Sequence, residues 1–186
     1  MRESVYISLV HHPVYDRRKR VVTTSITNLD LHDLSRLART FGLGGFFVVQ
    51  PSPLQRKLAE RIIAHWERGY GADYNVTRKE AFQLVTLAET VEEVSEQIEE
   101  REGRPPTIVA TTGREFPNQV DYDFFRKELP ERLPVLILFG TGWGLADELI
   151  LSSHVILKPV KISEDYNHLS VRCAAAIILD RILGRE

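Results

Sequence analysis

Short apolar runs that alternate with amphipathic stretches constrain the fold of this chain most strongly. The apolar runs are rich in β-branched residues and predict strands at 4–10, 20–26, 44–49, 82–86, 107–111 and 134–139. Between several of them lie predicted helices at 29–41, 54–69, 90–102, 144–151 and 167–183. The alternation predicts the α/β class, a parallel sheet flanked by helices with crossovers between strands. With 186 residues and no internal repeat or long linker, we expect a single domain over 1–186.

The expected sheet also indicates where a ligand would bind. The strand at 135–140 is apolar without alternation, which is typical of a central parallel strand covered on both faces. In open parallel sheets, ligands sit outside the carboxyl ends of the strands. Functional residues are therefore expected just after each strand.

The first candidate segment is the glycine-rich stretch from Phe139 to Leu145. Three glycines at alternating positions let a backbone approach a ligand closely and leave amides free to bind it, although they are equally typical of a turn. The spacing is GxGxG rather than the GxGxxG of dinucleotide-binding folds, and no Gly-Lys-Ser/Thr of a phosphate loop occurs.

Two further segments stand at helix ends. Asn167, His168 and Ser170 enter a helix that is opened by alanines, where free amides and polar side chains meet; an ordinary capped helix has the same pattern. The stretch 29–41 predicts a helix that ends at Gly42, and Arg39 in its last turn complements the helix dipole.

Charge and cysteine content narrow the class of protein. The net charge of −2 does not by itself indicate a nucleic-acid binder. A basic run occupies 17–20, which is either a solvated loop or an RNA contact, and an acidic helix occupies 89–102. The single Cys173 predicts a reduced, cytoplasmic setting. No apolar run predicts a membrane span, and no cluster of His, Cys or acidic residues predicts a metal site.

Taken in order, three motifs resemble those of the SPOUT superfamily of RNA methyltransferases. The stretch 32–43, with its Arg-Thr before a Phe-Gly-Leu turn, looks like the first motif. The stretch 137–145 is similar to the second, and 166–171 with the following alanines is similar to the third. The likeness spans about residues 5 to 184 and is strongest to stand-alone bacterial members predicted to methylate RNA.

The resemblance implies a fold, a cofactor and a site. It implies a C-terminal deep trefoil knot, a homodimer with RNA bound between subunits, and S-adenosylmethionine held by the knot loops. The cofactor contacts it implies are Thr111, Thr112, Gly113, Leu138, Phe139, Gly140, Thr141, Gly142, Trp143, Gly144, Leu157, Pro159, Asn167, His168, Leu169 and Ser170. The RNA contacts would be Arg17, Arg18, Lys19 and Arg20.

The resemblance also implies catalytic residues, with two departures. The arginine of the first motif falls on Arg39, which in ribose-methylating relatives assists activation of the 2′-hydroxyl. Asp33 stands where the ribose-methylating branch has asparagine, and His168 stands near the position of another asparagine in the third motif. Either residue could serve as the base. The expected activity is methyl transfer to tRNA or rRNA, at a ribose 2′-hydroxyl or a base nitrogen. The alternatives are a non-catalytic knotted RNA-binding protein and a small-molecule enzyme that binds an adenine nucleotide.

Overall fold

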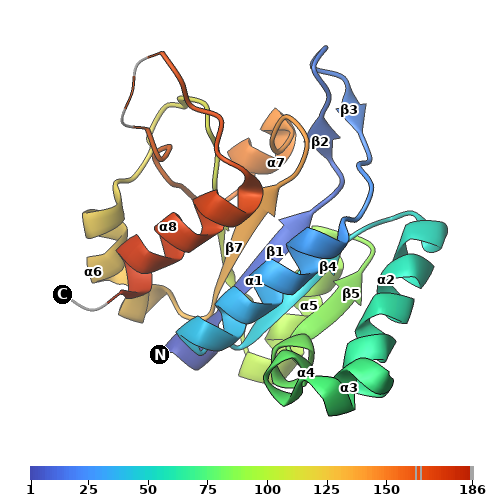
Figure 1. Cartoon of the computed structure of the whole chain (residues 1–186). Coiled ribbons are helices and arrows are strands. Elements are labelled where there is room, and N and C mark those ends of the chain that lie inside the picture. The colour runs from blue at the N-terminus through green and yellow to red at the C-terminus, as the bar shows by residue number, and fades with distance from the viewer. Residues whose placement is uncertain (162, 164, 185–186) are drawn as a thin grey trace.

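The computed structural model describes residues 1–161, 163 and 165–184 and contains a six-stranded parallel sheet (Figure 1). The strand order is β5-β4-β1-β7-β6-β8. The bounds of these strands are β1 Val5–Val10, β4 Gly45–Val49, β5 Val85–Ala88, β6 Thr107–Ala110, β7 Val135–Gly140 and β8 Val155–Ile156. A separate antiparallel pair consists of β2 Val14–Tyr15 and β3 Val21–Val22. The predicted parallel α/β architecture is confirmed.

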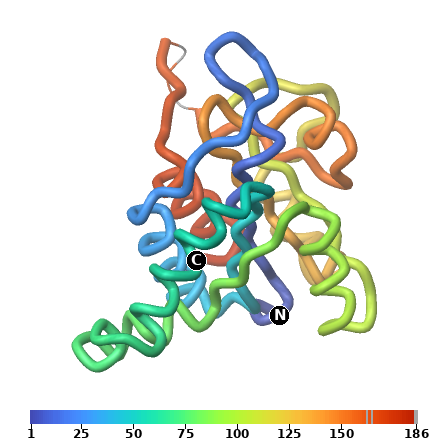
Figure 2. The backbone as a smooth tube through the Cα atoms, turned by 90° about the vertical axis from the view of Figure 1, so that its right-hand side faces the viewer, coloured from blue at the N-terminus to red at the C-terminus, as the bar shows by residue number. Residues whose placement is uncertain are grey.

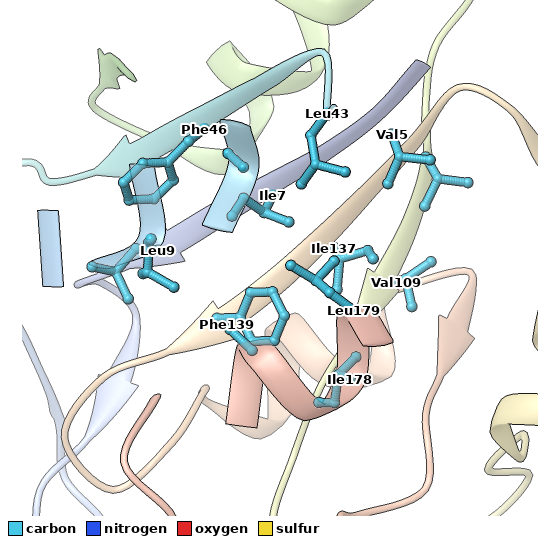
Figure 3. Packing of buried hydrophobic residues seen from close by; sticks show 14 of the residues in the cluster. Val5, Ile7, Leu9, Leu43, Phe46, Val109, Ile137, Phe139, Ile178 and Leu179 are labelled. Carbon is cyan, nitrogen blue, oxygen red and sulfur yellow. The ribbon is translucent and has the colours of Figure 1, made fainter. Parts of the chain in front are cut away.

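The two central strands are apolar because both of their faces are covered. Every residue of β1 is buried, and β7 is buried from Val135 to Phe139. Ile7 and Leu9 face one core cluster, together with Phe46 and Ile137, whereas alternate residues such as Val10 face the second cluster (Figure 3). Alternate side chains of a strand point to opposite faces, so a strand between two cores carries no polar alternation.

Helices cover the two faces unequally. One face packs against α1 Asn28–Phe41, α2 Pro53–Glu67, α4 Val76–Phe82, α6 Tyr122–Arg132 and α8 Val171–Leu183. The other packs against α5 Val91–Glu102 and α7 Asp147–Leu151. Two further short helices are η1 Arg2–Ser4 and α3 Tyr70–Tyr74. Within the described residues, no helix has both the length and the apolarity that a membrane crossing requires.

Helix α1 begins and ends as its sequence predicts. Thr27 caps its start, because the Thr27 hydroxyl accepts a hydrogen bond from the backbone N–H of Asp30. Gly42 ends it in the left-handed region, with φ of 67°. The inner face includes Leu31, Leu34 and Ala38, all fully buried.

Several predicted elements differ from those observed. The run 20–26 is not a strand of the main sheet: only Val21–Val22 forms a strand, in the hairpin with β2. The run 82–86 is shifted, because α4 ends at Phe82 and β5 begins at Val85. The helices predicted at 144–151 and 167–183 begin later, at Asp147 and Val171.

Apolar residues recur every four positions in α2, at Leu54, Leu58, Ile62 and Trp66, which predicts one buried stripe; the prediction is wrong for the first half. Leu54 is 80% exposed and Leu58 is also exposed, whereas Ile62 and Trp66 pack against the core. Ala59 is the fully buried residue of this helix. A strict spacing of four drifts around a helix of 3.6 residues per turn, so the two ends of the stripe cannot both face the core.

The β2–β3 hairpin and the segment that enters α8 project from the same end of the molecule (Figures 1 and 2). This is the end at which β1, β6 and β7 finish, because all three strands run parallel. The hairpin is joined to the loop after β7 by a bridge between Val14 and Leu145. Segments far apart in the sequence thus meet beyond the carboxyl ends of the central strands.

Candidate cofactor and RNA site

A pocket of about 830 Å³ lies at the carboxyl ends of the central strands. Its volume falls within the range of small-molecule sites. Four segments form it: the return from the hairpin, the loop after β6, the loop after β7 and the entry to α8. The lining residues are Thr24, Ser25, Thr27, Asp30, Thr111, Thr112, Gly113, Arg114, Phe139, Gly140, Thr141, Gly142, Trp143, Gly144, Val160, Asn167, His168, Leu169, Ser170, Val171, Ala174 and Ile178.

Most of the cofactor residues expected from the sequence lie together in this pocket. Leu138, Leu157 and Pro159 are not among its lining residues. Leu138 and Leu157 are buried in the sheet layer, and Leu157 forms a bridge with Val120. Val160 is the nearby residue that reaches the pocket.

The glycines after β7 serve different purposes. A Cβ on Gly140 would lie 2.6 Å from the backbone nitrogen of Leu145, so this glycine permits close packing. Gly142 and Gly144 have φ of 60° and 94°, which L side chains rarely adopt. A Cβ on Gly142 would approach the carbonyl oxygen of Tyr15 at 3.0 Å, whereas a Cβ on Gly144 would meet nothing within 4 Å.

The entry to α8 is fixed to the loop after β6. The Asn167 side-chain amide donates to the carbonyl oxygen of Gly113 at 2.8 Å. Ser170 caps α8, since its hydroxyl accepts a hydrogen bond from the backbone N–H of Cys173 at 3.3 Å. Asn167 and Ser170, two of the three polar residues singled out at this helix entry, thus hold the wall of the pocket.

Behind the pocket, sequence reasoning missed a buried polar network. His11 is fully buried, and its Nδ1 lies 3.0 Å from the Thr24 hydroxyl, which in turn hydrogen-bonds the Thr141 hydroxyl. Burial lowers the pKa of His11 to about 4, and the nearby charge of Asp30 opposes that shift. The imidazole is therefore neutral at neutral pH.

A second missed group joins α1 to α8. Asp30 is only 6% exposed and accepts a hydrogen bond from Arg172 Nη1 at 2.5 Å and from the Thr27 hydroxyl at 2.6 Å. Arg172 Nε also lies 3.2 Å from Asp33. The capping signal of Thr27 could have pointed to this end of α1, but no local pattern links Asp30 to Arg172.

The three expected catalytic residues do not meet within the chain. His168 lines the pocket. Asp33 is held between Arg172 and Arg36 and is not a lining residue. Arg39 lies nine residues beyond Asp30 along α1, about 14 Å at the helical rise, and is ion-paired with Glu80 at 3.0 Å. The chain's own pocket therefore does not include the Arg39 guanidinium.

The basic run lies at the turn of the hairpin. The Asp16 carboxylate accepts hydrogen bonds from the backbone N–H groups of Arg18 and Arg20 and from Arg20 Nε. The Arg20 amide in particular lowers the pKa of Asp16. Among the described residues, no ion pair is formed by the side chains of Arg17, Arg18 and Lys19.

Comparison with known proteins assigns the chain to a family. The family model of S-adenosylmethionine-dependent RNA methyltransferases matches residues 4–184. The chain belongs to this family. Its cofactor is therefore S-adenosylmethionine, and the methyl acceptor is RNA.

Among the described residues, no group of three or more His, Cys, Asp and Glu side chains is arranged so that it could hold a metal ion.

Curated relatives of this methyltransferase are more than 40% identical to it in sequence. An uncharacterized protein of Aquifex aeolicus is 43% identical over 187 aligned positions, covering all of this chain and 91% of the relative. A tRNA (guanine-N(1)-)-methyltransferase of Oleidesulfovibrio alaskensis is 44% identical over 181 residues. This match covers 97% of the chain but only 42% of the relative, so more than half of that protein lies outside it.

Solved structures share the methyltransferase's fold at low sequence identity. A probable methyltransferase from Bordetella pertussis superposes with a TM-score of 0.64 at 18% identity, covering 98% of this chain and 97% of that one. The SpoU methyltransferase AviRb of Streptomyces viridochromogenes, solved with AdoMet, gives 0.61 at 16% identity, covering 96% and 56%. The fold is therefore that of SpoU-type methyltransferases.

Proposed function

We propose that this methyltransferase binds S-adenosylmethionine in the pocket at the strand ends and transfers the methyl group to a nucleotide of tRNA. The observation that carries the proposal is the convergence of 111–114, 139–144 and 167–170 on one pocket. The polar residues that these segments contribute, such as Thr112 and Asn167, suit the polar edge of an adenine and the ribose hydroxyls. The apolar lining from Phe139, Leu169 and Ile178 suits the ring faces.

The residues present fit the cofactor. A Cβ on Gly144 would meet nothing within 4 Å, and a Cβ on Gly113 would make only ordinary contacts with Asn167, at 3.7 Å or more. Thr112 lines the same pocket, and its hydroxyl, which accepts a hydrogen bond from the backbone N–H of Arg114, retains its own proton to donate. When bound, S-adenosylmethionine supplies an electrophilic methyl group on its sulfonium.

The protein's part is to align the acceptor atom and to take up its proton. Of the three catalytic candidates, His168 is the one at the pocket, and imidazole is the side chain that commonly exchanges protons near neutral pH. We assign the proton acceptor to His168. Asp33 and Asp30 instead anchor Arg172 and hold the first turn of α8 against α1.

The acceptor nucleotide is proposed to lie in tRNA because the matched relative is named a tRNA methyltransferase. Its guanine-N1 specificity is not carried over, since most of that relative lies outside the match. The acceptor atom is a ribose 2′-hydroxyl or a base nitrogen. A tRNA substrate agrees with the cytoplasmic setting predicted from the single Cys173.

RNA would approach over the hairpin. The basic run 17–20 lies in the turn between β2 and β3, and this hairpin projects from the same end of the molecule as the segment that enters α8 (Figure 1). Phosphate contacts supply most of the sequence-independent affinity for nucleic acids. The acidic helix α5 lies on the opposite face of the sheet from α1 and α8.

Two finer features complete the proposal. The segment 167–171 would pass through the loop after β6 and the loop after β7 as a trefoil knot, a course supported by the Asn167–Gly113 hydrogen bond.

The protein would act as a homodimer with RNA bound between subunits. Light scattering at micromolar concentration would then give about twice the 21.3 kDa chain mass, and a monomer would contradict a shared RNA site.

Calorimetry tests the cofactor assignment. S-adenosylhomocysteine, the demethylated product, should bind at micromolar levels, and ATP should not compete. Gly113→Val should abolish binding, because its branched side chain would narrow the pocket. Its Cβ alone would make an ordinary 3.7 Å contact with Asn167, and circular dichroism checks that the variant stays folded. Preference for ATP would identify an adenine-nucleotide enzyme instead.

A further inference from the structure

Trp143 is an exposed aromatic residue at the mouth of the cofactor pocket. Its side chain is 57% exposed, although tryptophan is usually largely buried. It lies between Gly142 and Gly144, both with positive φ. Trp143 thus lines the pocket and still presents a large apolar surface to solvent.

Two more rings continue from Trp143 in a row, first His168 and then Tyr166. The His168 ring lies 6.4 Å from that of Trp143 with an interplanar angle of 68°. The Tyr166 ring lies 5.3 Å from His168 at 84° and is 68% exposed. The rings meet edge to face rather than stacking on one another, so their contacts leave flat surface available for a planar ligand.

The backbone at Trp143 is fixed to the basic hairpin. The Trp143 N–H donates to the carbonyl oxygen of Tyr15 at 3.0 Å, and the Tyr15 N–H donates to that of Gly144 at 2.9 Å. Tyr15 immediately precedes the turn that carries the basic run at 17–20. The exposed ring and the cationic side chains therefore belong to one hydrogen-bonded unit.

We propose that Trp143 and Tyr166, with His168 between them, form a stacking site for the unpaired nucleobase that is methylated or for its immediate neighbour. The proposal rests on the proposed function and adds how the acceptor is held. Proteins that act on single nucleotides take the base out of its stack and place it against aromatic side chains. Here phosphates would contact the hairpin while the base lies on Trp143, next to the cofactor pocket.

The test measures RNA affinity and cofactor affinity separately. Its probes are bulk tRNA from a strain that lacks the gene and S-adenosylhomocysteine. With the cofactor product saturating, Trp143→Ala should bind tRNA about tenfold more weakly or worse, the scale of one base–aromatic stack. Trp143→Phe should retain most of the affinity, because it keeps an aromatic face. The matched control is Tyr74→Ala, which removes another exposed aromatic ring, on α3 away from the pocket.

Fluorescence supplies a readout that does not depend on the alanine variant folding. The chain has two tryptophans, so Trp66→Phe leaves Trp143 as the sole source of tryptophan fluorescence. Addition of tRNA should then quench its emission strongly.

Each outcome decides the assignment. Unchanged tRNA affinity in Trp143→Ala, or no quenching by tRNA, would overturn the stacking site while leaving methyl transfer intact. Loss of S-adenosylhomocysteine binding alone would make Trp143 a cofactor contact only. Wild-type protein that neither binds nor methylates the tRNA would instead overturn the proposed substrate.

Discussion

At the scale of single residues, position along a helix decides what a motif residue can do. The pattern around Arg39 resembles a catalytic motif, yet α1 carries Arg39 to its C-terminal end, where it pairs with Glu80. The opposite end of α1, with Thr27 and Asp30, borders the pocket. The catalytic role of Arg39 stays a prediction, and within the chain its guanidinium lies outside the pocket.

Arg39 allows a direct test of this placement. Because its ion pair with Glu80 is exposed, Arg39→Gln should lower the free energy of unfolding by at most about 1 kcal/mol. Cofactor affinity and methyl transfer to RNA should stay within about twofold of wild type, since the guanidinium is remote from the chain's own pocket. A fall in transfer of about 100-fold, the scale of one transition-state donor, would restore its catalytic role, with the site then reached in a partner subunit.

His11 should make stability depend on pH. Its pKa is lowered to about 4 in the folded protein from the usual 6.5, so below pH 6.5 the unfolded chain binds a proton that the folded chain does not. Stability is therefore lost as pH falls from 6.5 to 4, by up to about 3 kcal/mol.

The variant His11→Asn isolates this effect, because its amide can replace Nδ1 toward Thr24 but cannot titrate. Urea unfolding at pH 7 and at pH 4.5 should show a smaller loss of stability for the variant than for wild type. The lowered pKa of His32 is common to both proteins and cancels. Equal losses in the two proteins would show that His11 is not buried as a neutral group.

At the scale of elements, local patterns predicted the strands β1, β4, β6 and β7 and the helix α1. These succeed because burial on two faces or along one stripe leaves a repeating signature. Helix α6 was not predicted, since Pro130 lies inside it and only Tyr122, Phe125 and Leu129 mark its buried side. The run 20–26 predicts a strand of the main sheet, whereas its Val21 and Val22 pair with β2, and Val14 of β2 bridges to Leu145; no local pattern contains these pairings.

The hairpin is also the element whose function can be separated from the pocket. The double variant Arg17→Gln, Arg18→Gln should weaken tRNA binding and flatten its dependence on salt. The log–log slope of affinity against salt concentration should change by about 1 for each phosphate that the variant no longer neutralises. Affinity for S-adenosylhomocysteine should not change, because neither residue lines the pocket.

The pair Lys57→Gln, Arg61→Gln removes the same charge from the exposed side of α2 and serves as the control. If both double variants weaken tRNA binding equally, the effect comes from net charge alone and the hairpin is not part of the RNA site.

At the scale of the whole molecule, the pocket depends on topology. Segments from four parts of the chain, between residues 24 and 178, meet because β1, β6 and β7 end at one edge and α8 returns there. The sequence allowed most of the loops to be predicted, since each follows a strand or opens a helix. The sequence did not predict the contact of Asp30 with Arg172, or the hydrogen bonds that link His11, Thr24 and Thr141, because these contacts join residues from separate elements.

Methyl transfer to tRNA can be followed with labelled cofactor. Purified protein is incubated with S-adenosylmethionine carrying a labelled methyl group and with tRNA from wild-type and gene-deletion strains, and the nucleosides are then separated by mass spectrometry. We predict label in one nucleoside of the deletion-strain tRNA, little in wild-type tRNA that is already methylated, and none with Gly113→Val. Absence of label from both tRNA pools, with S-adenosylhomocysteine bound normally, would show that tRNA is not the methyl acceptor.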